Sequence, residues 1–115
     1  MERKIELTLR IDGEEKTFTQ DFVPFSKRTD YIKKENSLRE EKTSEGLEPT
    51  ADDYLEMQIQ FVADLFDEKE LTKEAILNGM DALDIDKIWE IISYRVLGLS
   101  KTDVEESKKE KAEEI

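Results

Sequence analysis

Apolar residues recur at steps of three and four over residues 50–66, TADDYLEMQIQFVADLF, and polar or acidic side chains fill most positions between them. This spacing is typical of an amphipathic helix, because 3.6 residues make one turn and the apolar side chains then share a face. Thr50 can accept a hydrogen bond from a free N–H group of the first turn, and Asp53 stands where it can accept one in return. We therefore expect a helix over residues 51–67 that is covered from more than one side.

Near the amino terminus, apolar and polar residues alternate strictly instead. In residues 4–10, KIELTLR, the isoleucine and both leucines fall on one side of a strand, and the polar residues fall on the other. Asp12-Gly13 accepts the positive φ angles of a type I′ turn, and the following EKTFT resumes the alternation. We predict a β-hairpin over residues 4–19. Its apolar face must dock on helices or on another strand, because a lone hairpin is marginally stable in water.

A weaker helical pattern follows over residues 27–38. Ser26 is a candidate N-cap for this helix, whose apolar stripe is thin and whose basic residues make it the most basic part of the chain. Residues 40–49, EEKTSEGLEP, combine glycine, serine, proline and charge with a single leucine. This composition predicts a loop.

Two further helices are expected in the second half of the chain. Thr72 is the candidate N-cap of a short helix over residues 73–79. Asp84 or Asp86 is expected to open the last helix, over residues 86–97. The apolar residues that follow the three-and-four step there, and that we expect in the core, are Ile85, Ile88, Trp89, Ile92, Val96 and Leu99.

These elements predict an α+β fold, in which an N-terminal β-hairpin packs on a small bundle of three to four α-helices. At 115 residues the chain has room for one small domain, which we place at residues 1–100. Residues 101–115, KTDVEESKKEKAEEI, contain few apolar side chains, and we expect them to form a mobile charged tail, either frayed helix or disordered.

The formal net charge is −12, and residues 48–80 carry nine acidic and two basic residues. Direct binding to nucleic acid is therefore not expected, because affinity for phosphates comes from lysine and arginine. No apolar run is long enough for a membrane span, and the alternating start lacks the apolar core of a signal peptide. We expect the protein to have no membrane partner and to act in the cytoplasm.

The sequence has few residues of the types that commonly serve in catalysis. The chain has no cysteine and no histidine, so the common nucleophile–base pairs and the commonest metal ligand are missing. The acidic residues lack the spacing of a calcium loop, and no glycine-rich phosphate loop is present. We expect no catalytic residues, no cofactor and no metal site, and the acids are interpreted as a solvated face.

The candidate partner-binding residues are Phe22, Val23, Phe25 and Tyr31. Phe22 and Phe25 flank Pro24 between the hairpin and the next helix, where they can form an apolar surface patch of the kind that marks a protein contact. The alternative, that these rings are tucked under a helix, has equal weight at this stage.

Two stretches of the chain resemble the tail assembly chaperones of long-tailed phages that infect Gram-positive bacteria. The first is the opening MERKIELTLRIDGEEKTFTQDFVPFSKR, which is similar to that family in its short hairpin, the following Phe-Val and a basic helix. The second is FVADLFDEKELTKEAILNGMDA. The resemblance covers about residues 4–97 and departs at residues 28–49, where the family usually has a more apolar helix. The residues that carry it are Leu7, Thr8, Leu9, Ile11, Gly13, Lys16, Thr17, Phe18, Thr19, Phe22, Val23, Phe61, Val62, Phe66, Leu71, Thr72, Leu77, Gly79 and Asp81.

The resemblance implies a non-enzymatic assembly factor. Such chaperones are thought to cover the long helical tape-measure protein before tail-tube subunits polymerise around it, and to be absent from the mature virion. The implied partners are the tape-measure protein and the tail-tube protein, and self-association is left open. Two other interpretations are an acidic DNA mimic that inhibits a DNA-binding enzyme and a small adaptor domain with no special chemistry. A mimic needs carboxylates spaced like phosphates along an exposed ridge.

Overall fold

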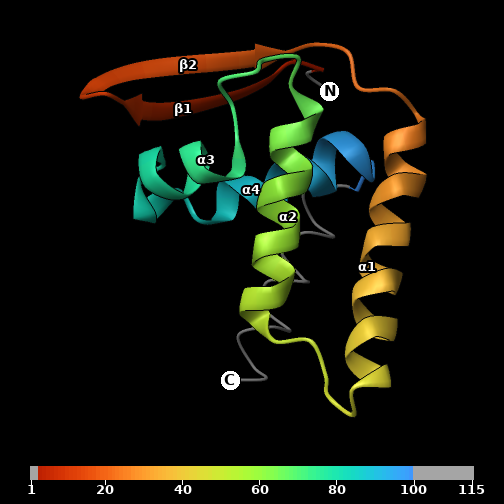
Figure 1. The fold of residues 1–115 in the computed structure, drawn as a ribbon. Helices are drawn as coiled ribbons and strands as arrows, with labels where there is room; N and C mark the ends of the chain where they lie inside the picture. Colours follow the sequence, from red (N-terminus) through yellow and green to blue (C-terminus); the bar gives the residue numbers. More distant parts are fainter. Residues whose placement is uncertain (1–2, 100–115) are drawn as a thin grey trace.

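A β-hairpin lies across one end of a group of helices (Figure 1). The structure is a computed structural model that describes residues 3–99. Strands β1, Ile5–Ile11, and β2, Glu14–Gln20, pair in antiparallel register. Asp12 and Gly13 between them have φ angles of 52° and 81°, the positive values of a type I′ turn. The predicted α+β class and hairpin are confirmed, and the tail expected at residues 101–115 lies outside the described residues.

The long helices α1 and α2 run antiparallel, and α3 lies on the opposite side of α2 from α1 (Figure 1). The glycine that ends α3, Gly79, allows this helix to pack closely on β1. A Cβ atom at Gly79 would lie 2.7 Å from the carbonyl oxygen of Arg10. The helical segments are α1 Ser26–Ser44, α2 Ala51–Leu65, α3 Lys73–Gly79, the 3₁₀ turn η1 Ala82–Asp84, α4 Asp86–Glu90 and the π-helical η2 Ile91–Val96.

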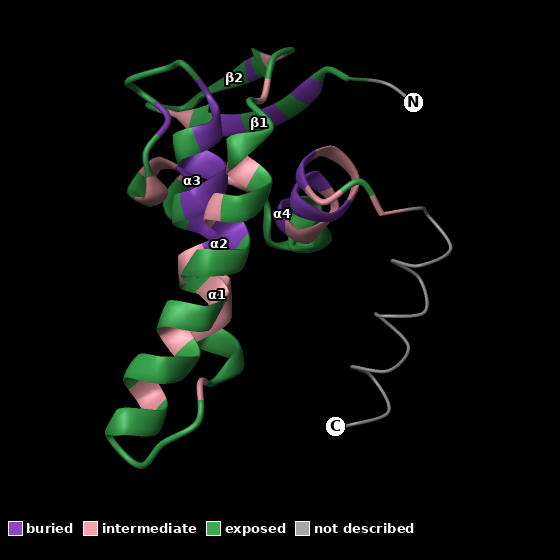
Figure 2. Cartoon of the chain, turned by 90° about the vertical axis from the view of Figure 1, so that its right-hand side faces the viewer, coloured by how far each residue is buried: buried purple, intermediate pink, exposed green. Residues whose placement is uncertain are grey.

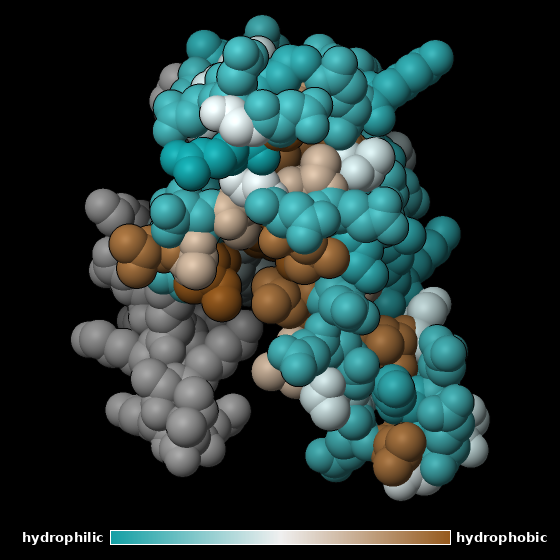
Figure 3. Space-filling model, turned by 60° about the vertical axis from the view of Figure 1, so that its left-hand side comes forward, coloured by the Kyte–Doolittle hydropathy of each residue, from teal (hydrophilic) through white to brown (hydrophobic). Residues whose placement is uncertain are grey.

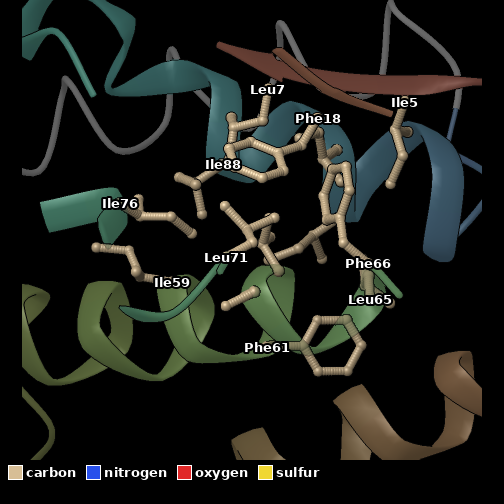
Figure 4. Close-up of a cluster of buried hydrophobic side chains, with 14 of the residues drawn as sticks. Ile5, Leu7, Phe18, Ile59, Phe61, Leu65, Phe66, Leu71, Ile76 and Ile88 are labelled. Atoms are coloured by element: carbon tan, nitrogen blue, oxygen red, sulfur yellow. The ribbon is translucent and has the colours of Figure 1, made fainter. Parts of the chain in front are cut away.

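The core fills the space between the apolar face of the hairpin and helices α2, α3 and α4. Leu71 lies in the middle of it, with Leu7 and Phe18 pointing down from the hairpin (Figure 4). Phe61 points the other way, toward α1 (Figure 4). Helix α2 contributes buried residues to both sides, as its wide apolar face predicts: Gln58, Ile59, Phe61, Val62, Ala63 and Leu65.

The predicted starts of α2 and α3 are confirmed. Thr50 Oγ1 accepts a hydrogen bond from Asp53 N at 3.1 Å, and Asp53 Oδ2 accepts one from Thr50 N at 2.9 Å. The bond from the Thr50 backbone is the main cause that lowers the pKa of Asp53, and Lys42 beside it acts in the same direction. Thr72 Oγ1 accepts from Ala75 N in the first turn of α3. These hydrogen bonds fix two helix starts at the positions the sequence indicates.

Helix α1 is longer than expected. It runs to Ser44 and includes part of the stretch 40–49 for which the composition predicts a loop, because no glycine or proline interrupts the chain before Gly46. Gly46 has a φ of 76°, and Leu47 N donates to Lys42 O at 2.8 Å, which closes the helix in a Schellman motif. The expectation for Ser26 was wrong as well: the N-cap position is Phe25, and no side chain caps the helix.

The last helix covers residues 86–96, close to the expected range, but its hydrogen-bond pattern changes from α to π along its length. Residue Asp81 caps the 3₁₀ turn η1, and α4 gives way to a π-helical turn in which Leu97 N donates to Ile92 O, five residues back. Asp86 is the first residue of α4, in agreement with one of the two predicted openings, and Ile85 stands at the N-cap position. The side chain of Ile85 is exposed instead of lying in the core, whereas Ile88 is fully buried.

Candidate partner-binding surface

The connector between β2 and α1 presents two aromatic rings to solvent. Phe22 is 71% exposed and Phe25 is 82% exposed, while Val23 between them packs against the core. Exposure of two phenylalanines so close in the chain is unusual, because each fully buried ring is worth about 1.5–3 kcal/mol. The alternative in which these rings are tucked under a helix is wrong.

Two polar side chains hold the connector in place. Gln20 at the end of β2 donates from Nε2 to the carbonyl oxygen of Phe22 at 2.9 Å, and Asp67 N donates to Gln20 Oε1 at 3.2 Å. Arg95 of η2 donates from Nη2 to the carbonyl oxygen of Asp21 at 2.7 Å and from Nε to that of Arg3 at 2.5 Å. The connector is thus fastened to the α2–α3 loop on one side and to η2 on the other. Its exposed rings stand on a fixed backbone.

The exposed surface continues along the first two turns of α1. Ile32 follows Phe25 by seven residues, which places both side chains on the same side of the helix, and Ile32 is exposed. Arg28 and Lys33 flank this line, and both are exposed. We call Phe22, Phe25, Arg28, Ile32 and Lys33 the α1 surface. It combines apolar contact area with positive charge.

Tyr31 is not part of the α1 surface. The sequence places it among the partner-binding candidates, but its ring is 1% exposed and lies in the core. Its hydroxyl donates to Glu35 Oε1 at 2.6 Å and accepts from Gln58 Nε2 at 3.2 Å. Burial is the main cause that raises the pKa of Tyr31, and the bond to Glu35 adds to it. Tyr31 therefore joins α1 to α2 and is not presented to a partner.

Comparison with known proteins decides the family of this chain. A family model described as "Phage tail chaperone protein" matches residues 2–114. The chain belongs to this family of phage tail chaperones. No curated protein and no solved structure matches it. The resemblance found in the hairpin and in the α2–α3 region is thereby confirmed at the level of the family, and family membership suggests a role in tail assembly that is not enzymatic.

The tail chaperone has a second exposed apolar area, which sequence reasoning missed. Leu83 in η1 is 91% exposed, and Leu77 of α3 and Ile85 before α4 are exposed as well. Figure 3 looks at the side that carries α3 and shows hydrophobic side chains gathered below the hydrophilic hairpin. The segment from Asp81 to Asp86 contains three acidic residues and no basic one. We call Leu77, Leu83, Ile85, Asp81 and Asp84 the α3 surface.

The acidic residues of the tail chaperone form no metal centre among residues 3–99. No group of three or more of them could hold a metal ion in the part of the chain that the structure describes. Asp64, Asp67 and Glu68 line an open groove together with Lys69 and Lys73, as a solvated charged surface does. Within the same residues, no helix is both long and apolar enough to cross a membrane.

Proposed function

We propose that this tail chaperone binds the tape-measure protein of a long-tailed phage of a Gram-positive bacterium, keeps it soluble and helps to recruit tail-tube subunits. It acts by binding alone, as a non-enzymatic factor without a cofactor, in the cytoplasm of the host. It leaves before the virion is mature. The observation that carries the proposal is the α1 surface, in which Phe22 and Phe25 stand exposed on a connector held by Gln20 and Arg95.

The physical requirements of a tape-measure chaperone support this assignment. A long helical protein exposes apolar stripes that associate with one another unless they are covered. An apolar surface on a carrier can cover such a stripe, and the net charge of −12 keeps the carrier and its cargo apart from other copies. A carrier of this kind can give up its cargo to tube subunits that fit more closely.

The alternative of a DNA mimic is less well supported by the positions of the acids. Several carboxylates between Glu48 and Met80 are paired with lysines. Asp53 lies 3.7 Å from Lys42, Glu56 lies 3.9 Å from Lys73, and Glu70 is paired with Lys16. A mimic of the DNA backbone needs an unpaired row of negative charges. Binding of an apolar protein segment agrees better with the exposed apolar side chains than a DNA mimic does.

Co-expression with the tape-measure protein of the same phage tests the proposal. We expect the tape-measure protein to be soluble with the native chain and to precipitate with the double variant Phe22→Ser, Phe25→Ser. The matched control is Leu47→Ser, which removes an exposed apolar side chain outside both surfaces and should leave the soluble fraction unchanged. A tape-measure protein that is no more soluble with the native chain than without it overturns the proposal. Competition with DNA for a nuclease would favour the mimic.

A further inference from the structure

The α1 surface carries positive charge on a chain whose net charge is negative. Residues 27–34 contain four basic residues and one acidic residue, whereas residues 48–80 contain nine acidic and two basic ones. Arg28 and Lys33 are both exposed. The surface therefore combines exposed apolar side chains with a local charge opposite in sign to the −12 of the whole chain. Charge of this kind selects among partners that offer the same apolar area.

The apolar side chains of the α1 surface are spaced to match another helix. Phe25 has helical φ and ψ angles of −55° and −32°, so it continues the line of α1, and Ile32 follows seven residues later, about 10.5 Å along the axis. A helix laid along α1 presents apolar residues at the same interval in its heptad repeat. An extended segment covers this distance in about three residues, and residues three apart in a strand point to opposite faces. The spacing therefore favours a helical partner over an extended one.

The two cations lie on opposite sides of this apolar line. Arg28 comes three residues after Phe25, which is less than one helical turn, and Lys33 comes eight residues after it, which is more than two turns. Neither cation has an ion-pair partner within residues 3–99. Both charges are therefore available to the polar borders of a helix that lies on Phe25 and Ile32.

We infer that the partner of the α1 surface is an amphipathic helix whose apolar stripe is bordered on both sides by aspartate or glutamate. The stripe covers Phe25 and Ile32, and the bordering carboxylates pair with Arg28 and Lys33. Helix α1 lies at the outer edge of the helix group, where a second helix can approach its outer side (Figure 1). At physiological ionic strength the Debye length is about 8 Å, so these adjacent cations outweigh the more distant acidic residues of the chain.

The inference names the segments of the cargo that the tail chaperone covers. Its assignment to the tape-measure protein rests on the proposed function, whereas the preference for acidic borders follows from the α1 surface alone. Helical segments with lysine or arginine beside the apolar stripe meet like charge at Arg28 and Lys33 and are disfavoured there. The preference is therefore tested on the tail chaperone with model peptides, without the tape-measure protein.

Two synthetic helical peptides of identical composition provide the test. Each has about three heptads with leucine at the a and d positions. The first has glutamate beside the leucine stripe and lysine on the far face, and the second has these two residue types exchanged, so both peptides have the same net charge. Each is labelled with a dye and titrated with the full chain, and fluorescence anisotropy measures binding. We expect the peptide with glutamate borders to bind about tenfold more tightly than the peptide with lysine borders.

Charge reversal on the chain is the decisive measurement. The double variant Arg28→Glu, Lys33→Glu should reverse the preference, so that the peptide with lysine borders binds more tightly. The matched control is Lys69→Glu, Lys87→Glu, which changes the net charge by the same amount at exposed positions outside the α1 surface and should keep the native preference. All four side chains are exposed or bordered by solvent, so the variants are expected to fold, and circular dichroism checks this point.

Binding elsewhere on the chain is separated by the aromatic residues. The acidic α3 surface can also bind the peptide with lysine borders. Binding is therefore assigned to the α1 surface only where the variant Phe22→Ser, Phe25→Ser removes it. We expect this variant to bind the peptide with glutamate borders at least about tenfold more weakly than the native chain does.

Several outcomes overturn the inference. These are equal affinity of the native chain for the two peptides, no binding of either, and a preference that survives Arg28→Glu, Lys33→Glu in a folded chain. Light scattering on the mixture covers a further occupant: free peptide beside particles of several chains would assign the α1 surface to a second copy and overturn the inference as well. Failure of the proposed function looks different, because the tape-measure protein then stays insoluble in co-expression. A soluble tape-measure protein without a peptide preference contradicts only the inference.

Discussion

The rings of Tyr31 and Phe61 meet edge to face, with their centroids 5.1 Å apart and their planes at 69°. Tyr31 is the buried residue of α1, and Phe61 is the residue of α2 that points toward it (Figure 4). Gln58 on α2 adds a hydrogen bond to the Tyr31 hydroxyl, and Trp89 lies 6.5 Å from the ring, centroid to centroid. One side chain of α1 thus contacts three residues of the rest of the fold.

Truncation of this side chain is expected to be costly. Tyr31→Ala should lower the free energy of unfolding by about 3–5 kcal/mol, because it leaves a cavity beside Phe61. Tyr31→Phe should lower it by about 1–3 kcal/mol, because the buried amide of Gln58 loses its partner. Urea denaturation measures both values. The control on the same helix is Ile32→Ala, an exposed position where a change within about 0.5 kcal/mol is expected. Equal effects at the two positions would contradict the anchoring role.

The stability of the tail chaperone should fall in alkaline solution because of Tyr31. The fold raises the pKa of this tyrosine above its ordinary value, chiefly by burial. Above pH of about 10 the unfolded chain loses the proton that the folded chain keeps, so the free energy of unfolding falls as pH rises, by up to about 1.4 kcal/mol per pH unit. Below that pH this contribution is fully present. Urea denaturation at a series of pH values measures the slope, and Tyr31→Phe should remove its share. An identical slope in that variant would refute the assignment.

Arg95 should control the order of the connector that carries Phe22. Arg95→Met keeps much of the side-chain volume but loses the bonds to the carbonyl oxygens of Asp21 and Arg3, and we expect a loss of about 1.5–3 kcal/mol in the free energy of unfolding. Amide hydrogen exchange at residues 21–25 should become faster. Arg95→Lys should restore the stability and the slow exchange only in part, because an ammonium group cannot donate in two fixed directions as the guanidinium does. Unchanged hydrogen exchange in Arg95→Met would show that Gln20 alone is enough to hold the connector in place.

Gly79 should not tolerate a side chain. In an ordinary helix, glycine to alanine stabilises by about 1 kcal/mol. Here the added Cβ would lie 2.7 Å from the carbonyl oxygen of Arg10, so Gly79→Ala must push α3 away from β1 and should destabilise by about 1–3 kcal/mol. The neighbouring exposed position provides the control, since Asn78→Ala should change stability by no more than about 0.5 kcal/mol. Thermal or urea unfolding decides the sign.

Turns and helix caps formed by residues close in the sequence could be predicted, and contacts between distant segments could not. The Asp12-Gly13 turn and the threonine caps at Thr50 and Thr72 were predictable, because the atoms that form them lie within four residues of one another. The end of α1 was placed too early because charged residues such as Glu40 and Glu41 were assigned to a loop. They are good helix formers, and the true stop is the positive φ of Gly46.

The exposed surfaces were predictable only in part. Phe22 and Phe25 stood out because they flank a proline, and the structure exposes both, whereas their binding to a partner stays a prediction. The sequence analysis places Tyr31 at the surface and Ile85 in the core, whereas the structure buries Tyr31 and exposes Ile85. Periodicity puts a residue on one side of a helix, but which side faces the core depends on how α1 and α4 lie on α2. Leu83 gave no signal, because an isolated leucine between aspartates has no helical neighbours to compare with.

The single buried ring of α1 also sets how firmly this helix is held. Figure 2 shows α1 mainly in the colours of exposed and half-buried residues. A segment with few buried contacts opens at a lower free energy than the rest of a fold, so we expect the amides of α1 to exchange hydrogen faster than those of the hairpin and α2. Opening of α1 would uncover the Phe61 ring. Release of Tyr31 from Phe61, Gln58 and Trp89 would therefore be the step that exposes this apolar area.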